Sequence, residues 1–363
     1  MMVKKEHHDE SALRVQAGIE QPSSVNPEAA KKLSGKGSGK RPAEEYVKGI
    51  LSGNRTLLSQ AITLVESSLP RHQETARQII AGCVPYSGRS VRIGITGVPG
   101  AGKSTFIEAF GKLLTRLNHK IAVLAIDPSS QRTKGSILGD KTRMEELAND
   151  PKAFIRPSSS SGTLGGVARN TRESIILCEA AGFDVIIVET VGVGQSETAV
   201  HSMVDFFLLL MIAGAGDELQ GIKRGIMEMA DAIVINKADG DNIARAELAQ
   251  REFKNALHLF PPPLSGWSPD VVTASSTEGK GIADIWEMIM QYQQHTKALG
   301  YFDQHRREQA LQAFQDSVEE VIRQQFYHHP EVSAALPVLK AKILAGKISP
   351  YAAAQEVLGK YRE

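Results

Sequence analysis

Cysteine is scarce in this sequence, and neither sign of charge is in excess. The 363 residues include two cysteines, Cys83 and Cys178, which lie far apart in unrelated contexts. A disulfide framework or a cysteine-based metal site needs more thiols at closer spacing, so we expect neither, and a reducing cytoplasm fits. The 42 basic residues nearly balance the 41 acidic ones, for a formal charge of +1. That balance gives no electrostatic reason to expect nucleic acid or an anionic membrane as a partner.

Long apolar runs are also missing. The longest lies near residues 206–213 and is far shorter than the ~18 apolar residues of a membrane-spanning helix. The polar N-terminus carries Glu6, Asp9 and Glu10, which argues against a secretory signal and against an acid-poor transit peptide. We therefore expect a soluble, cytoplasmic protein.

Four stretches of different character divide the chain. Residues 1–42 are rich in Lys, Ser, Gly and Pro and have no apolar stripe, which predicts a disordered tail. Residues 43–88 carry helical apolar stripes, with Asn54 placed as a helix N-cap. Residues 89–295 alternate apolar runs with amphipathic segments, and residues 296–363 return to a helical pattern. The third stretch is expected to form the main domain.

A glycine-rich segment follows the first apolar run of that domain. Gly97-Val98-Pro99-Gly100-Ala101-Gly102-Lys103-Ser104-Thr105 fits the pattern G-x-x-x-x-G-K-[ST] of a phosphate-binding loop. Glycines let backbone N–H groups curl around a β-phosphate, and the helix that opens at Lys103 directs its positive end at the anion. We expect Lys103 to supply charge to the β- and γ-phosphates and Ser104 to give its hydroxyl to Mg²⁺.

Six continuous apolar runs indicate strands that are covered on both faces. They are Val91–Thr96, Ile121–Ile126, Val185–Val188, Phe206–Ile212, Ala232–Ile235 and Val271–Thr273. Their alternation with amphipathic helices predicts an α/β fold, a doubly wound and mostly parallel sheet of the P-loop NTPase type with helical extensions at both ends. Ligands of such sheets bind at the C-terminal ends of the strands.

Two acidic residues beyond the phosphate loop are candidates for the metal shell. Asp127 ends the second apolar run, where it could reach Mg²⁺ directly or through water, or could simply cap a turn. The segment 132–143 mixes glycines with charges and suits a switch that orders on the γ-phosphate, with Asp140 as its metal candidate. A solvated cluster of charges would have the same composition.

An apolar strand that ends in a carboxylate lies further along, in Val185-Ile186-Ile187-Val188-Glu189. Glu189 is expected to organise the water of Mg²⁺, and Gly192 to meet the γ-phosphate with its N–H. Val193 occupies the position where Ras-type switches keep a water-orienting Gln. Intrinsic hydrolysis, an in-line attack of water on the γ-phosphate, should therefore be slow.

Base selection is expected from Asn236-Lys237-Ala238-Asp239, which matches N-K-x-D at the end of an apolar run. The carboxylate of Asp239 can accept hydrogen bonds from N1–H and from the exocyclic amine of guanine, an arrangement that adenine does not offer. Asn236 and Lys237 would brace the loop and cover the base, and Ser275, Ser276 and Thr277 would form a further base-contacting loop. The bound nucleotide is therefore predicted to be GTP or GDP.

For two later segments, the residues alone leave two interpretations open. In the glycine-hinged segment 214–225, Lys223 could swing to the phosphates as a charge stabiliser, or the acidic pair Asp217-Glu218 could simply cap the next helix. A long amphipathic helix beyond the main domain has the apolar positions Leu311, Phe314, Val318, Val321, Ile322 and Phe326. That helix should fold back on the domain or pair with a second copy of the chain.

In combination and in this order, the motifs closely resemble those of the MeaB/ArgK GTPases, SIMIBI-class relatives of the methylmalonic aciduria type A protein. The resemblance covers about residues 43–330 and rests on the phosphate loop, Asp127-Pro128-Ser129-Ser130, Gly139-Asp140-Lys141-Thr142-Arg143, the Glu189–Gln195 segment, Leu219-Gln220-Gly221-Ile222-Lys223 and the N-K-x-D motif.

This resemblance implies a homodimeric GTPase, with residues 296–363 as its dimerisation arm. Such a protein is a chaperone and gatekeeper of an adenosylcobalamin-dependent mutase, methylmalonyl-CoA mutase or a sister acyl-CoA mutase, and a cobalamin adenosyltransferase is a further candidate partner. It also implies a phosphate and Mg²⁺ set made of Lys103, Ser104, Asp127, Asp140 and Glu189. Lys223 would then belong to a third switch and join Lys103 and Glu189 as a catalytic residue.

Two other classes of protein would share the nucleotide core. A nickel-delivery GTPase needs Cys and His ligands, and the two cysteines and the His pairs form no recognisable set. A small-molecule kinase needs a substrate acid near the γ-phosphate, which the sequence does not assign.

Overall fold

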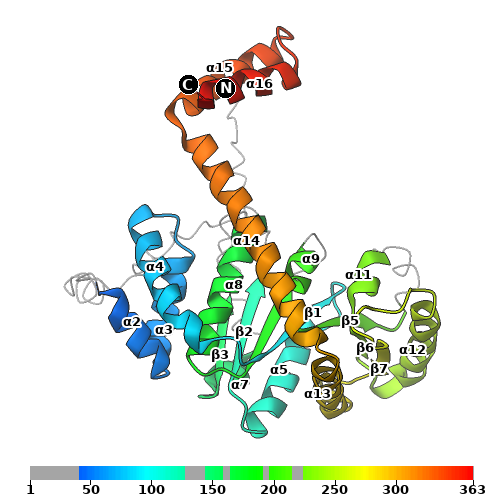
Figure 1. Cartoon of the computed structure of the whole chain (residues 1–363). Helices are drawn as coiled ribbons and strands as arrows, with labels where there is room; N and C mark the ends of the chain where they lie inside the picture. The colour runs from blue at the N-terminus through cyan, green and yellow to red at the C-terminus, as the bar shows by residue number, and fades with distance from the viewer. Residues whose placement is uncertain (1–40, 127–143, 158–163, 191–195, 215–223, 363) are drawn as a thin grey trace, which may run out of the picture. The chain divides into compact units, whose positions relative to one another are not determined.

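A computed structural model describes residues 41–126, 144–157, 164–190, 196–214 and 224–362 of the chain (Figure 1). All of these except Arg41 belong to one unit, Pro42–Glu363. Within the described residues, seven strands pair in parallel in the order β3-β2-β4-β1-β5-β6-β7. They are β1 (Val91–Gly97), β2 (Ile121–Ile126), β3 (Ala153–Pro157), β4 (Val185–Thr190), β5 (Phe206–Ile212), β6 (Ala232–Asn236) and β7 (Asp270–Thr273).

Burial explains the continuous apolar runs of the inner strands. Every residue of β2 and β4 is buried, because helices cover both faces of the sheet (Figure 1). The helices between β1 and β7 are α5 (Lys103–Arg116), α7 (Glu145–Asn149), α8 (Leu164–Ala180), α9 (Ser196–His201), α11 (Arg224–Met229), η2 (Gly240–Asn242) and α12 (Ile243–Leu257). The predicted doubly wound, parallel α/β fold is therefore confirmed.

One strand, β3, was not predicted from the sequence. It lies at the edge of the sheet and pairs only with β2, from Ile121 opposite Ala153 onwards. Only Ala153 and Phe154 of its five residues are buried, and it ends at Pro157. A short edge strand of this kind lacks the continuous apolar run by which the other strands were recognised.

The N-terminal helical segment consists of α2 (Ala43–Leu51), α3 (Arg55–Val65), α4 (Pro70–Cys83) and η1 (Val84–Tyr86), and it packs against α8. Asn54 is the N-cap of α3, as predicted, and its side chain accepts hydrogen bonds from the N–H groups of Thr56 and Leu57, each at 3.1 Å. An ion pair of 2.6 Å between Arg156 Nη2 and Glu66 Oε2 links β3 to the residue that follows α3.

The C-terminal stretch continues with α13 (Ile282–Ala298), α14 (Tyr301–His328), α15 (Pro330–Leu344) and α16 (Pro350–Arg362). α15 and α16 share a small apolar cluster of their own, made of Val332, Leu339, Ala353 and Val357. The apolar stripe of α14 is largely uncovered in the described part of the chain, since Leu311 is 65% exposed, Phe314 66% and Ile322 56%. Of the two predicted outcomes, folding back on the domain does not bury this stripe.

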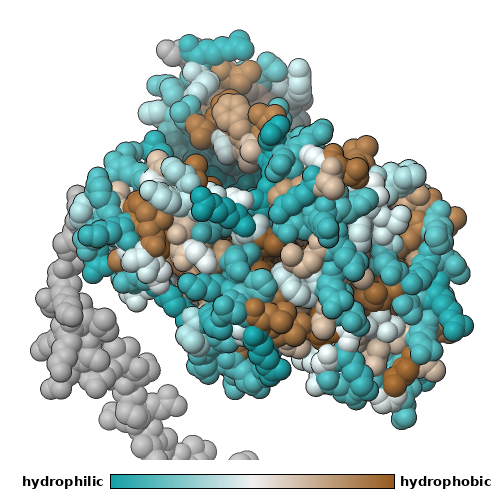
Figure 2. All heavy atoms as spheres, turned by 60° about the horizontal axis from the view of Figure 1, so that its bottom comes forward, coloured by the Kyte–Doolittle hydropathy of each residue, from teal (hydrophilic) through white to brown (hydrophobic). Residues whose placement is uncertain are grey.

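None of the helices in the described ranges has both the length and the apolar composition that crossing a membrane requires. Figure 2 shows one face of the molecule, on which hydrophobic side chains are scattered among hydrophilic ones.

Candidate nucleotide-binding site

The predicted phosphate loop lies between β1 and α5. β1 ends at Gly97 and α5 begins at Lys103, as expected. Gly100 and Gly102 have φ values of +81° and +82°, in the left-handed region that favours glycine. The Lys103 ammonium donates to the carbonyl oxygens of Gly97 at 2.8 Å and Val98 at 3.4 Å. The Lys103 side chain therefore lies across the same loop that is predicted to bind the phosphates with it.

Gly97 owes its identity to the close approach of another strand. A Cβ atom at this position would lie 2.2 Å from the backbone oxygen of Leu210 on β5. Since that oxygen belongs to the backbone, no side-chain rotation relieves the contact. Pro99 and Thr105 are exposed, whereas Val98 and Ala101 are buried.

The structure brings two of the four predicted metal ligands together. Ser104 at the start of α5 donates its hydroxyl to Glu189 Oε1 at 3.4 Å. Glu189 lies near the end of β4, in register with Ile95 on β1, and is 5% exposed. A hydroxyl and a buried carboxylate are oxygen ligands of the kind that Mg²⁺ prefers, so these two residues fit the predicted ion.

Charge around the phosphate loop includes a residue that the sequence did not single out. Burial lowers the pKa of Lys103, and the negative charges of Glu189 and Glu197 act in the opposite direction. Glu197 belongs to the first turn of α9 and is 1% exposed. The sequence does show that Glu197 is an acidic residue shortly after the Glu189–Gln195 segment. It does not show that this carboxylate is buried or that its charge acts on Lys103.

Asn236 at the end of β6 joins the predicted base loop to the phosphate loop. Its Nδ2 donates to the carbonyl oxygen of Ala101 at 2.8 Å, and its Oδ1 accepts from Ser276 Oγ at 2.8 Å. The next residue, Lys237, has φ +60°, which is unusual for a residue with a side chain. Three segments that are distant in sequence thus meet at one buried amide.

Asp239 is held as a hydrogen-bond acceptor. Its Oδ2 accepts from Ser275 Oγ at 2.5 Å and from Thr277 Oγ1 at 3.0 Å. These hydrogen bonds, the one from Ser275 foremost, lower the pKa of the Asp239 carboxyl group. The loop after β7, predicted to contact the base, therefore lies against the N-K-x-D motif and favours the ionised form of its carboxylate.

Four predicted site residues, Asp127, Asp140, Gly192 and Lys223, lie outside the described residues. Asp127 directly follows Ile126, which is in register with Thr190 at the end of β4. No group of three or more His, Cys, Asp or Glu side chains that could hold a metal occurs in the described ranges. Cys83 and Cys178 are both buried and are not joined by a disulfide.

Comparison with known proteins agrees with this geometry. The family model "Methylmalonyl Co-A mutase-associated GTPase MeaB" matches residues 58–331. The chain is 52% identical to the GTPase ArgK of Escherichia coli over 278 residues, which cover 77% of this chain and 84% of that protein. It is 45% identical to the mitochondrial methylmalonic aciduria type A homolog of Mus musculus over 324 residues, 86% of this chain and 78% of that protein.

A solved structure is similar over most of its length. The crystal structure of a LAO/AO transport system kinase is 39% identical and has a TM-score of 0.69, with 88% of this chain and 98% of that chain covered. The parallel sheet, the phosphate loop and the N-K-x-D motif together define a P-loop GTPase. The chain belongs to the MeaB family of these enzymes, which includes ArgK.

Proposed function

We propose that this GTPase is a Mg²⁺-dependent switch for an adenosylcobalamin-dependent acyl-CoA mutase, with methylmalonyl-CoA mutase as the partner. It acts as a chaperone and gatekeeper that couples GTP hydrolysis to cofactor loading and to protection of the mutase. The description of the matching family, a methylmalonyl Co-A mutase-associated GTPase, is the observation that carries this proposal. The mouse relative, whose name refers to methylmalonic aciduria, supports the same metabolic setting.

Binding of the nucleotide is assigned to the residues that meet at the C-terminal edge of the sheet. The loop from Gly97 to Thr105 cradles the phosphates with its N–H groups, and Lys103 adds a positive charge. Asp239 reads guanine, while Asn236 keeps the base loop and the phosphate loop in fixed relation. The hydrogen bonds of Asp239 and Asn236 support this assignment.

Hydrolysis then depends on positioning and charge rather than on covalent chemistry. Ser104 and Glu189 would hold Mg²⁺, with Asp127 and Asp140 completing the set. A bound Mg²⁺ would neutralise charge on the β- and γ-phosphates. Gly192 would offer its N–H to the γ-phosphate, and Lys223 would add charge to its oxygens. Val193, which cannot orient water, leaves the unassisted reaction slow, so that a partner can accelerate it.

A homodimer accounts for the uncovered stripe of α14. Side chains as large as Leu311 and Phe314 are more than half exposed there, on a helix that continues past the main domain. Pairing with the same stripe of a second copy would bury it in an isologous contact. A cobalamin adenosyltransferase is a further candidate in the assembly with the mutase.

The proposal is tested by measuring phosphate release from GTP with and without purified methylmalonyl-CoA mutase. We expect the mutase to form a complex with the protein on size exclusion and to raise GTP turnover severalfold. Lys103→Ala is the control, because stimulation through this site requires the phosphate-loop lysine. Absence of both a complex and stimulation, with wild-type GTP binding intact, would overturn the mutase assignment and leave the GTPase assignment standing.

A further inference from the structure

The short helix α9 rests directly on β1, the strand that leads into the phosphate loop. A Cβ atom at Gly94 would lie 2.8 Å from Val200 Cγ1 and 3.0 Å from Val204 Cγ2. Val200 belongs to α9, and Val204 lies in the segment that connects α9 to β5. Both valines are 2% exposed or less. Because closely packed side chains leave no free space, a shift of α9 would also displace β1.

The same helix packs against β4, the strand that carries Glu189. The position of α9 therefore affects both β1 and β4, the two strands that lead to the nucleotide site.

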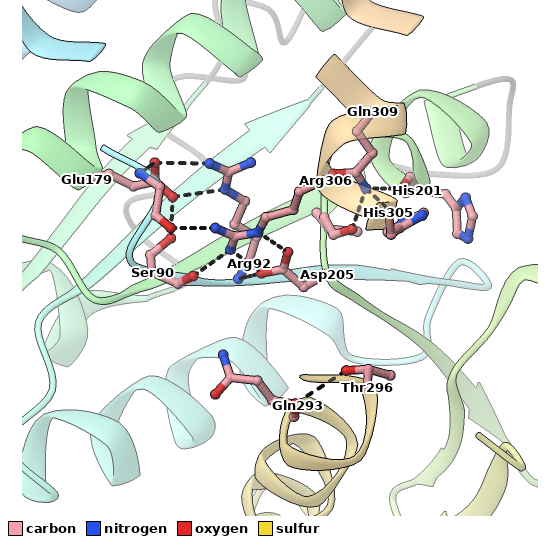
Figure 3. A network of polar contacts seen from close by, with 12 residues as sticks. Ser90, Arg92, Glu179, His201, Asp205, Gln293, Thr296, His305, Arg306 and Gln309 are labelled. Carbon is pink, nitrogen blue, oxygen red and sulfur yellow. Dashed lines mark hydrogen bonds and ion pairs between the residues drawn. The ribbon is translucent and has the colours of Figure 1, made fainter. Parts of the chain in front are cut away.

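The far end of α9 is held by the long C-terminal helix α14. Gln309 donates from Nε2 to the carbonyl oxygens of Val204 at 2.7 Å and His201 at 3.5 Å. Figure 3 shows Gln309 close to His201 and His305. The Gln309 residue is 9% exposed. His305, one turn earlier on α14, lies with its ring centroid 6.3 Å from that of His201. A buried amide that binds two carbonyl oxygens fixes direction and distance, which apolar contact alone does not.

A second link runs between the same two helices through α8. Arg172 donates from Nη2 to Ser202 Oγ at 2.8 Å and from Nη1 to Asp316 Oδ2 at 3.0 Å. Ser202 directly follows α9, and Asp316 lies on α14 two turns beyond Gln309. The end of α9 is thus attached to α14 directly and through one arginine.

We propose that Gln309 is a positioning residue for GTP turnover, which acts from α14 by fixing the end of α9 and, through the packing of that helix, the strands β1 and β4 that lead to the nucleotide site. This inference deepens the proposed function and rests on the nucleotide site assigned there. It also connects the uncovered stripe of α14 to GTP turnover, because any partner that binds the stripe contacts the helix that holds α9.

The test compares Gln309→Met with Gln304→Met in single-turnover and steady-state GTP hydrolysis. Methionine keeps the volume of the side chain and removes its hydrogen bonds. Gln304 is a matched control, since it lies on the same helix and its amide donates only to Glu308 on the exposed surface. We expect kcat of Gln309→Met to fall about tenfold with KM for GTP changed less than about twofold, because misplacing a group near the reacting atoms costs rate while the loops still bind.

Asp316→Asn provides a second variant that keeps α14 otherwise intact. Its side chain is 40% exposed, so the fold should tolerate the change, and we expect a smaller fall in kcat of about threefold, again without a change in KM. Wild-type kcat in both folded variants would overturn the positioning role. Lys103→Ala, measured in parallel, separates the two proposals: if it bound GTP normally, the nucleotide site itself would be wrong.

Discussion

Arg306 on α14 donates from Nε and Nη2 to the two carboxylate oxygens of Asp205, each at 2.7 Å (Figure 3). The same guanidinium donates to the backbone oxygens of Gly88 and Ser90, at 2.6 Å each. Asp205 in turn accepts from the N–H of Arg92 at 2.8 Å. These contacts lie at the N-terminal ends of β1 and β5, and the nucleotide site lies at the opposite, C-terminal ends of the strands. They attach the first turns of α14 to the main domain.

Removing one charge of this pair should be costly. The side chains of Arg306 and Asp205 are 15% and 3% exposed, so Asp205→Asn leaves a largely buried guanidinium without its counter-charge. We expect the free energy of unfolding to fall by about 3 kcal/mol or more. Urea denaturation followed by circular dichroism measures it. Asp270→Asn removes the exposed pair with Lys254 and should cost about 1 kcal/mol or less. Equal losses in the two variants would contradict this account.

A buried carboxyl group makes stability depend on pH. Burial raises the pKa of Asp231 to about 7, and the charge of Asp205 acts in the same direction, against hydrogen bonds from the Phe207 N–H and from Tyr292. Because the pKa is higher in the folded state, this group contributes its full stabilisation below about pH 4 and loses it as the pH rises to about 7.

The variant Asp231→Asn tests that dependence. Its amide oxygen can still accept from the Phe207 N–H, which donates to Asp231 Oδ2 at 2.8 Å in the wild type, but it has no proton to lose in this range. Between pH 4 and pH 7 we expect its free energy of unfolding to decline less than that of the wild type. Urea midpoints at several pH values provide the measurement, and parallel profiles would show that Asp231 is not the titrating group.

Base recognition should change when Asp239 loses its charge. Asp239→Asn keeps one acceptor oxygen for N1–H but replaces the other by an N–H donor, which opposes the exocyclic amine of guanine and suits the carbonyl that xanthine has in place of that amine. We expect GTP affinity to fall about a hundredfold or more and XTP to bind better than GTP. Competition against a fluorescent guanine nucleotide measures both. Unchanged GTP affinity in the folded variant would disprove the guanine assignment.

The uncovered stripe of α14 predicts the oligomeric state. Phe314 is 66% exposed, and a charge at its position would have to be buried on pairing. We expect the wild type to sediment as a dimer and Phe314→Asp as a monomer in analytical ultracentrifugation. Gln315→Asp, a polar exposed neighbour, should remain dimeric. A wild type that is monomeric at high concentration would disprove pairing through this helix.

The sequence predicted those features that depend on burial of a strand on both faces or on the local geometry of the backbone. The inner strands, the start of α5 at Lys103 and the cap at Asn54 are of this kind, since each depends on residues that are neighbours in the chain. Edge strand β3, buried over only part of its length, carried too weak a pattern.

Contacts between distant residues were not predictable in the same way. The amide of Asn236 was expected to brace its own loop, but its donation to Ala101 joins two motifs 135 positions apart. Arg306 is one of several charged residues on a polar helix, and nothing local distinguishes it from its neighbours. Such partners are chosen by the packing of helices on the sheet, which a single sequence does not display.

The central claim is that the phosphate loop, the Ser104–Glu189 pair and the Asn236–Asp239 loop hold one Mg²⁺-bound GTP. Displacement of a fluorescent, non-hydrolysable GTP analogue from the wild-type protein tests it most directly. We predict that GTP displaces the analogue, that ATP does so at least about a hundredfold more weakly, and that chelating Mg²⁺ weakens binding of the analogue. Equal displacement by ATP and GTP, with no effect of chelation, would contradict the claim.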